Sequence, residues 1–131
     1  MAKRLHEKLK VWQLSVAFVS RLYALTAKFP DAERYGLISQ IRRAGISIPA
    51  NIAEGAARGS DADYLRFLRI SRGSLSELET LLLIAKNLHF LEESDYSSLL
   101  DGCESIGSLL AGLARRLKAS LISEEDAAYD A

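Results

Sequence analysis

Residues 8–29, KLKVWQLSVAFVSRLYALTAKF, repeat apolar side chains at spacings of three and four residues. This spacing follows the 3.6-residue turn of an α-helix, so we expect a helix over residues 7–28. Its first apolar stripe consists of Val11, Leu14, Phe18, Leu22, Leu25 and Phe29. A helix with such a stripe must bury it against other elements, and the rest of the chain repeats the pattern.

Three further amphipathic helices follow in the sequence. We expect them over residues 32–58, 61–88 and 94–119. Phe29-Pro30 and Gly59-Ser60 separate the first three helices, because proline disfavours helix at the residue before it and glycine suits a helix C-terminus. The link over residues 89–93 is short, so the fourth helix returns antiparallel to the third. The sequence predicts an all-α domain over residues 1–119, an antiparallel up-down four-helix bundle.

Pro49 lies inside the helix expected over residues 32–58. Proline removes one backbone donor, and its ring crowds the carbonyl four residues earlier. We therefore expect this second helix to be kinked near Pro49, or to break into two shorter helices. Asp31 is expected to cap it. Residues 120–131 are acidic with little periodicity, which predicts a frayed or extended C-terminal tail.

A second apolar stripe on the first helix is made of Trp12, Val16, Val19 and Tyr23. One face of a four-helix bundle needs only one stripe. The surplus stripe predicts a second buried surface, and these four residues are candidates for an oligomer interface. The alternative is a first helix deeply embedded in a bundle that stands alone.

The charge is balanced overall but unevenly placed. The chain has 17 basic and 17 acidic residues, with formal charges of +5 over residues 1–30, +1 over 31–90 and −6 over 91–131. This polarity allows a basic and an acidic surface on one molecule, which would orient subunits against each other. A single cysteine excludes an intrachain disulfide. The N-terminus lacks an apolar signal region and no apolar run could span a bilayer, so we expect a cytosolic protein without a membrane partner.

Residues for catalysis, metals or cofactors are scarce. His6 and His89 are the only histidines, and neither follows a glutamate by three residues as a di-iron bundle requires. One cysteine and two distant histidines are too few for zinc. No phosphate-binding glycine loop follows a strand, and no histidine is placed to activate a serine. Cys103 lies on an apolar stripe and is expected in the core. The sequence therefore predicts no enzyme, no metal site and no cofactor.

Residues 40–58 are unusual for a bundle helix, because small side chains recur along them and permit close helix approach. Acidic residues follow at the matching part of the third helix. We expect a partly buried polar network between the two helices that fixes their register. Its candidates are Arg43, Asn51, Glu54, Glu77 and Glu79.

The arginines of the same region have a second interpretation. Arginine binds phosphate in bidentate geometry, so clustered arginines are candidates for nucleic-acid binding. The candidates are Arg42, Arg43, Arg58, Arg66 and Arg69, together with the basic N-terminal residues Lys3, Arg4, Lys8 and Lys10. Aromatic residues interleaved with these arginines, which would stack on bases, are missing from the pattern. A solvated charged face is the simpler alternative.

Several sequence blocks together resemble a known family. They are Val11-Trp12-Gln13, Phe29-Pro30, Glu33, Tyr35-Gly36-Leu37, QIRRA at residues 40–44, SIPANIAEG at 47–55 and GSLSELE at 73–79. These blocks resemble the bacterial four-helix bundle proteins of the ribosomal-RNA (23S rRNA) intervening sequences. The resemblance spans residues 8–118 and leaves the acidic tail outside.

The resemblance implies a small cytosolic helical bundle. A fold relative, the accessory variability protein of diversity-generating retroelements, forms a five-membered barrel and binds nucleic acid through a basic surface, which implies a homopentamer here. Two functions follow as expectations. The first is a non-catalytic ring that binds RNA or DNA. The alternative is a structural or adaptor ring that binds another protein and uses the arginines for its own packing.

Overall fold

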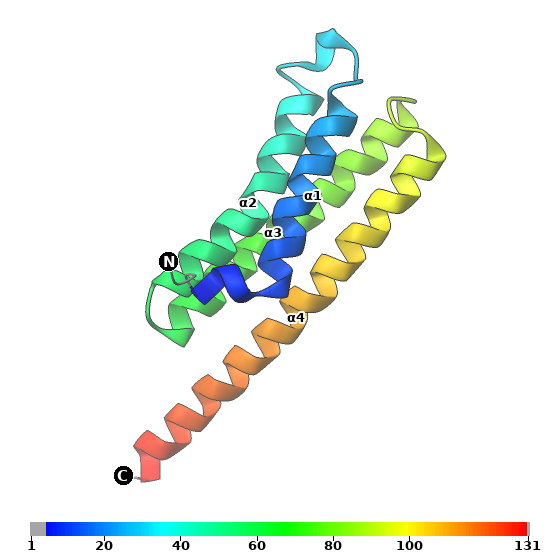
Figure 1. Ribbon diagram of the computed structural model, residues 1–131. Coiled ribbons are helices and arrows are strands. Elements are labelled where there is room, and N and C mark those ends of the chain that lie inside the picture. Colours follow the sequence, from blue (N-terminus) through cyan, green and yellow to red (C-terminus); the bar gives the residue numbers. More distant parts are fainter. Residues whose placement is uncertain (1–4, 131) are drawn as a thin grey trace.

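The computed structural model describes residues 5–130, apart from the side chains of Leu5, Lys8, Tyr129 and Asp130. Within this range the chain forms four α-helices, two short 3-10 helices and no strand (Figure 1). The α-helices are α1 Lys10–Thr26, α2 Leu37–Ala57, α3 Asp61–Asn87 and α4 Glu93–Asp130, and the 3-10 helices are η1 Leu5–Lys8 and η2 Asp31–Glu33. The predicted all-α four-helix class is confirmed.

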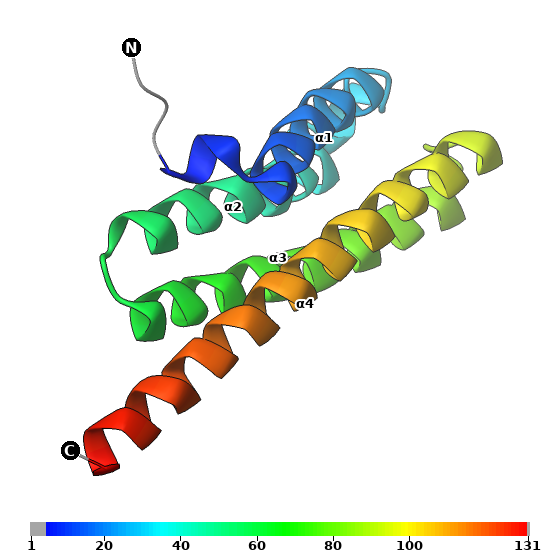
Figure 2. The same ribbon diagram turned by 60° about the horizontal axis from the view of Figure 1, so that its bottom comes forward.

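Consecutive helices run antiparallel, as predicted (Figure 1). In the turned view α1 lies beside α2 and α3 lies beside α4 (Figure 2). Helix α2 packs most extensively on α3, whereas α1 and α4 make the smallest contact of the four neighbouring pairs. The bundle is therefore held mainly through α2 and α3, and its α1–α4 side is the more open one.

Each helix places one apolar stripe in a shared core. The largest fully buried side chains are Leu22, Ile41, Ile48, Ile52, Leu68, Leu78, Leu82, Leu99, Ile106 and Leu110. Leu14 is the exception in the first stripe, because it lies on the open α1–α4 side and stays partly exposed. No buried side-chain nitrogen or oxygen of the described residues lacks a hydrogen-bond partner. Such a core, with its polar groups satisfied, fixes the helix positions on which any surface site depends.

The helix boundaries differ from the expected ones at the start of α2 and at the end of α4. After Pro30 the chain first makes η2, and α2 begins at Leu37. The carboxylate of Glu33 accepts a hydrogen bond from the Leu37 amide at 3.2 Å. Asp31, the expected cap of this helix, lies at the start of η2 instead. The structure thus gives the capping function to a glutamate and leaves a longer turn between α1 and α2.

Pro49 does not interrupt α2, which runs as one helix from Leu37 to Ala57. The expected break into two shorter helices is therefore wrong, while the kink stays a prediction. Ile48 and Ile52 on either side of the proline are fully buried. Packing of these residues against the neighbouring helices offsets the backbone hydrogen bond that proline removes.

The C-terminal tail is helical rather than frayed or extended. Helix α4 continues without a break to Asp130 and projects beyond the other three helices (Figure 1). Residues 122–128 are exposed, so no packing holds this part. The segment EEDAA at residues 124–128 contains good helix formers, and extending an existing helix costs much less than starting one. The boundary expected between residues 119 and 120 therefore falls inside a continuous helix.

Candidate nucleic-acid interface

The five candidate arginines do not gather on one surface. Arg42 and Arg43 lie near the start of α2, while Arg58 follows its end. Fifteen residues of helix separate Arg43 from Arg58, which is roughly 22 Å along the axis. Arg66 and Arg69 lie on the first half of α3, at the same end of the bundle as Arg58. The structure therefore divides the candidates into two groups at opposite ends of α2.

Arg58 and Arg66 interact with their own chain. Arg58 forms an ion pair with Glu54 at 2.7 Å, and Arg66 lies 3.6 Å from the carboxylate of Asp63. Both guanidinium groups also lie near the ring of Phe67, at 5.0 and 4.5 Å from its centroid. These two arginines therefore cover Phe67 and neutralise nearby carboxylates, which leaves them less available to a phosphate.

Arg42 is fixed against α1. Its Nε donates a hydrogen bond to Thr26 Oγ1 at 2.9 Å, and its Nη2 donates to the Tyr23 carbonyl at 3.3 Å. Its guanidinium carbon lies 4.2 Å from the centroid of the Tyr23 ring. The Thr26 hydroxyl is itself buried and donates to the Leu22 carbonyl at 2.6 Å. Arg42 therefore joins α2 to the end of α1 and holds a positive charge at a defined place.

A surface hollow of about 460 Å³ lies where the end of α1, the η2–α2 turn and the start of α2 meet. Its walls carry three arginines and two tyrosines, and no carboxylate is among the lining residues. The lining residues are Tyr23, Arg34, Tyr35, Ile38, Ser39, Arg42, Arg43 and Ile46. We call this site the arginine–tyrosine hollow. Three positive charges without a lining acid make it an attractive site for an anion.

The acid nearest in sequence does not line this hollow. Glu33 directs its carboxylate to the amide of Leu37 at the start of α2. Within the described residues, the side chain of Arg43 makes no hydrogen bond or ion pair. Its guanidinium is exposed and is therefore free to bind a ligand.

Arg34 and Tyr35 are not among the residues that the sequence predicts for a binding site. The sequence places residues 32–36 in the second helix, although the structure places them in η2 and the turn. The structure brings aromatic rings close to arginines of this region, because Arg34 lies 5.6 Å from the ring centroid of Tyr35 and Arg42 lies over Tyr23. The sequence signal that could have identified this site is the pair Arg34 and Tyr35 soon after Pro30, where a turn exposes both side chains.

The polar contact between α2 and α3 uses hydroxyl and amide groups rather than the expected ion pairs. Ser74 Oγ donates to Ser47 Oγ at 2.7 Å, and Asn51 Nδ2 also donates to Ser47 Oγ at 2.9 Å. Deeper in the contact, Ser71 Oγ donates to the Ile48 carbonyl at 2.9 Å. Of the expected network, only Asn51 takes part. Short hydroxyls fit because the two helices approach closely here.

The charged members of that expected network are not brought together. Glu54 pairs with Arg58 on the same helix segment. Glu77 and Glu79 are exposed on α3, and neither forms an ion pair with Arg43 within the described residues. The close approach of α2 and α3 leaves no room for long charged side chains between them, so these point to solvent.

The second apolar stripe of α1 lies on the surface of this single chain. Val16 and Tyr23 are each 40% exposed, and Trp12 and Val19 are half-buried. Trp12 packs its ring against His6, with the ring centroids 5.1 Å apart. The alternative of a deeply embedded first helix is therefore wrong for one chain. An oligomer interface at this stripe stays a prediction.

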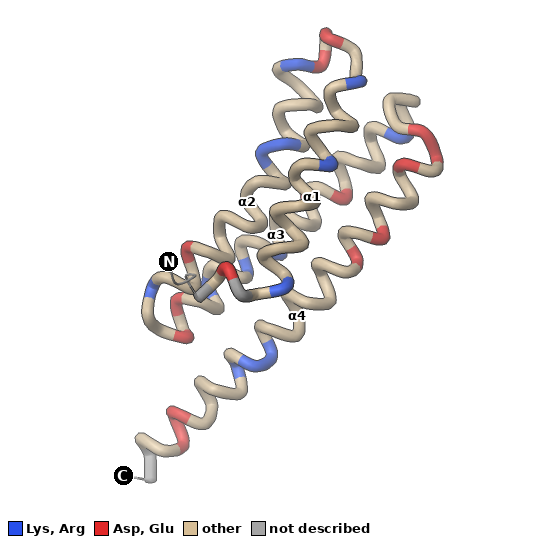
Figure 3. The backbone as a smooth tube through the Cα atoms, viewed as in Figure 1, with Lys and Arg blue, Asp and Glu red and all other residues tan. Residues whose placement is uncertain are grey.

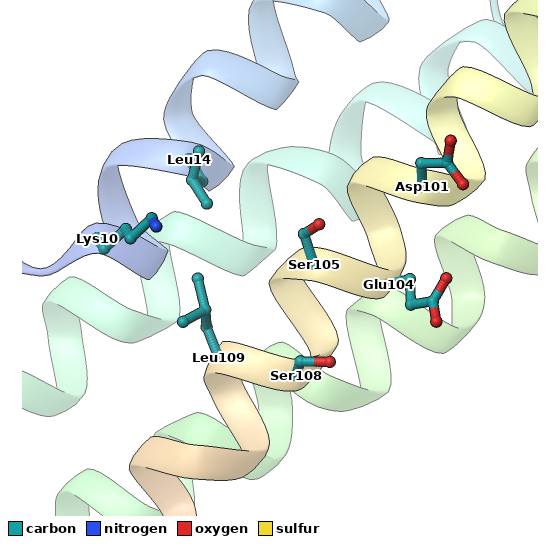
Figure 4. A pocket seen from close by; sticks show the side chains of 7 residues that line it. All are labelled: Lys10, Leu14, Asp101, Glu104, Ser105, Ser108 and Leu109. Atoms are coloured by element: carbon teal, nitrogen blue, oxygen red, sulfur yellow. The ribbon is translucent and has the colours of Figure 1, made fainter.

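A larger hollow, of about 600 Å³, lies on the open side between α1 and α4 (Figure 4). Figure 4 shows Lys10 on α1 across from Asp101 and Glu104 on α4. Its serines, Ser105 and Ser108, have no histidine among the lining residues to activate them. Among the side chains that the structure describes, no group of three or more histidine, cysteine, aspartate or glutamate residues is placed to hold a metal ion. The hollow therefore offers no recognisable catalytic arrangement.

Cys103 lies in the core, as expected for a residue on an apolar stripe. Burial, assisted by the negative charge of Glu79, raises the pKa of its thiol to about 12, against a smaller opposing effect of Arg21. Such a thiol stays protonated at neutral pH and is a poor nucleophile.

Burial also raises the pKa of the Tyr64 hydroxyl, and the positive charge of Arg116 lowers this pKa by a smaller amount.

None of the helices in the described part of the chain is both long and apolar enough to cross a membrane.

No curated protein matches the chain. A crystal structure of a protein of unknown function from the S23 ribosomal protein family of Bacteroides thetaiotaomicron is similar, with a TM-score of 0.75 and 26% sequence identity. The similarity covers 80% of this chain and 95% of that one.

The sequence also matches the model of a protein family over residues 7–112. This range includes all the blocks that carry the resemblance seen in the sequence. The solved relative has the same helical fold and a related family description. The chain belongs to the family of 23S rRNA-intervening sequence proteins.

Proposed function

We propose that this protein is a non-catalytic nucleic-acid-binding protein that uses the arginine–tyrosine hollow as its main contact with RNA or DNA. The observation that carries the proposal is the set of three arginines in this hollow without a lining carboxylate. Arginine is suited to the phosphate backbone, and contacts of this kind give affinity without requiring a particular sequence. Arg43 is central, because it is exposed and has no partner within the described residues.

The distribution of charge supports the same proposal. The α1–α2 turn carries the acids Asp31 and Glu33 beside its basic residues, while the beginning of α4 carries acidic residues alone (Figure 3). Acidic residues there include Glu92, Glu93, Asp95, Asp101 and Glu104. A polyanion would be attracted to the α2 side and repelled from the α4 side, so the chain would bind in one orientation.

We further propose that the protein assembles into a homo-oligomeric ring, and the family resemblance points to a pentamer. Val16 on α1 and Ile46 on α2 are exposed apolar residues, as are Leu83 and Ile84 on α3. A ring joins two different surfaces of neighbouring copies, so a basic start of α2 and an acidic start of α4 suit it. Repeating the hollow around a ring would add phosphate contacts and raise the overall affinity.

The alternative function is a structural or adaptor ring that binds a protein and no nucleic acid. It is favoured by Arg42, Arg58 and Arg66, whose guanidinium groups all interact with their own chain. In this alternative the arginines stabilise the scaffold, and the exposed apolar stripes carry the interaction.

The two functions are separated by measuring RNA and DNA binding of the purified protein across a series of salt concentrations. The assembly mass is measured on the same sample by light scattering. The proposal predicts binding that weakens steeply as salt rises, with a slope of about 0.7 to 0.9 per phosphate contact. If neither nucleic acid binds at low salt, the adaptor ring is the better account.

A further inference from the structure

Packing within the described part of the chain does not account for the position of the Tyr35 ring. It lies in the turn before α2 and is 88% exposed, more than any other large apolar side chain of the described residues. Its only described interaction is with the guanidinium of Arg34, 5.6 Å from the ring centroid. A ring left so fully in water adds little to the stability of the bundle. Its exposure on the edge of a binding hollow therefore points to an external partner.

The two tyrosines of the arginine–tyrosine hollow differ in how much of each ring is available. Arg42 lies over Tyr23 at 4.2 Å from the ring centroid, and Tyr23 is only 40% exposed. Tyr35 keeps most of its ring surface in solvent, at the edge of a hollow that also presents Arg34 and Arg43. A planar group that stacks on Tyr35 would therefore lie beside two positive charges.

This arrangement matches an unpaired nucleotide. Single-stranded nucleic acid is bound by aromatic rings that stack on bases and by a basic surface that follows the backbone. In a duplex the faces of the bases are covered by their neighbours, so a surface ring cannot reach them without unstacking the helix.

We propose that Tyr35 is a stacking platform for an unpaired base, and that Arg34 and Arg43 bind the phosphates beside it. The ligand of this protein is then single-stranded at its point of contact, in RNA or DNA. This inference rests on the proposed nucleic-acid-binding function and specifies its substrate. An acidic protein surface, including that of a second copy, would also be attracted by the arginines, and tyrosine is common at protein interfaces. The experiment below separates this ligand from an unpaired base.

The test compares a fluorescent single-stranded RNA oligonucleotide with the blunt duplex of the same sequence, by anisotropy at low salt. The proteins are the wild type, Tyr35→Ala, Tyr35→Phe and Tyr35→Leu. We expect Tyr35→Phe to bind as the wild type does. Tyr35→Ala and Tyr35→Leu should weaken single-strand binding by about 5- to 150-fold, because they lose the stacked ring, while duplex binding changes much less. Thermal unfolding serves as the fold control, and it should not change at so exposed a position.

The outcomes separate this inference from the function on which it rests. If the wild type binds both probes and Tyr35→Ala binds them equally well, the stacking platform is wrong and the nucleic-acid-binding function stands. If the wild type binds neither probe, the proposed function fails. If Tyr35→Ala changes the assembly mass in light scattering and leaves RNA affinity unchanged, the hollow is a contact between copies, which also overturns the inference.

Discussion

Gly55 of α2 lies directly against Phe67 of α3, so closely that a Cβ atom on Gly55 would come within 2.9 Å of the Phe67 Cβ. The same added atom would lie 3.0 Å from a ring carbon of Tyr64 and 3.2 Å from the Tyr64 carbonyl oxygen. Two of these neighbours are a Cβ atom and a backbone atom, which cannot rotate away. The contact between the two helices therefore depends on the missing side chain at Gly55.

Substitution of Gly55 by alanine should destabilise the protein. Overpacking of this kind costs about 1–3 kcal/mol of the free energy of unfolding, which exceeds the gain in helix propensity. Gly73 on α3 is the matched control, because it is exposed and a Cβ added there would meet no atom within 4 Å. Gly73→Ala should instead stabilise the protein by about 0.5–1 kcal/mol. Urea unfolding of both variants measures the difference, and equal effects would contradict the close contact.

His89, two residues after the last residue of α3, has a backbone conformation that favours glycine. Its φ angle is +64°, in the left-handed region. The His89 amide donates to the Lys86 carbonyl and the Phe90 amide to the Ala85 carbonyl, both at 2.9 Å, as in a Schellman motif. Replacing His89 by glycine should raise the free energy of unfolding by about 1 kcal/mol, because a left-handed residue with a Cβ is strained. A variant less stable than the wild type in thermal unfolding would show that the imidazole makes a contribution larger than this strain.

The thiol of Cys103 should make stability depend on alkaline pH. Its folded pKa is raised to about 12 from an ordinary value of 9.0, so the folded state favours the protonated thiol. The stabilisation is complete below the unfolded pKa and is lost as the pH rises from there toward the folded pKa. Between about pH 8 and about pH 10.5 this should remove about 2 kcal/mol from the free energy of unfolding. Urea unfolding of the wild type and Cys103→Ala tests it, since the variant should lose less over the same interval.

The sequence was sufficient to predict the helical core. Residues such as Leu22, Ile48 and Leu110 follow the helical period and are fully buried. Periodicity works here because burial of a continuous stripe stabilises each helix more than any local preference does. The same reasoning correctly placed Cys103 in the core.

The sequence was a poorer guide to the ends of the helices and to the site. Glu33 rather than Asp31 supports the start of α2, because the turn after Pro30 is longer than a single capping residue requires. That longer turn is what exposes Tyr35 and places Arg34 in the same hollow as Arg43. Such a grouping depends on how the chain turns in three dimensions, and the spacing of residues along a helix does not contain it.

The availability of each arginine could not be predicted from charge alone. Arg43 and Arg58 are both exposed arginines of the α2 segment, yet only Arg58 pairs with a carboxylate, that of Glu54. Which of two similar side chains has a partner depends on the rotamers and the neighbouring elements. This difference makes them a matched pair, because the same substitution removes the same charge from each.

The most direct test of nucleic-acid binding through the arginine–tyrosine hollow is the salt dependence of RNA affinity for the wild type, Arg43→Gln and Arg58→Gln. Our account predicts that Arg43→Gln weakens binding and lowers the salt slope by about 0.7 to 0.9, the loss of one phosphate contact. Arg58→Gln should leave both quantities close to those of the wild type. If the two variants bind alike, or if the wild type binds no RNA at low salt, the hollow is not the nucleic-acid site.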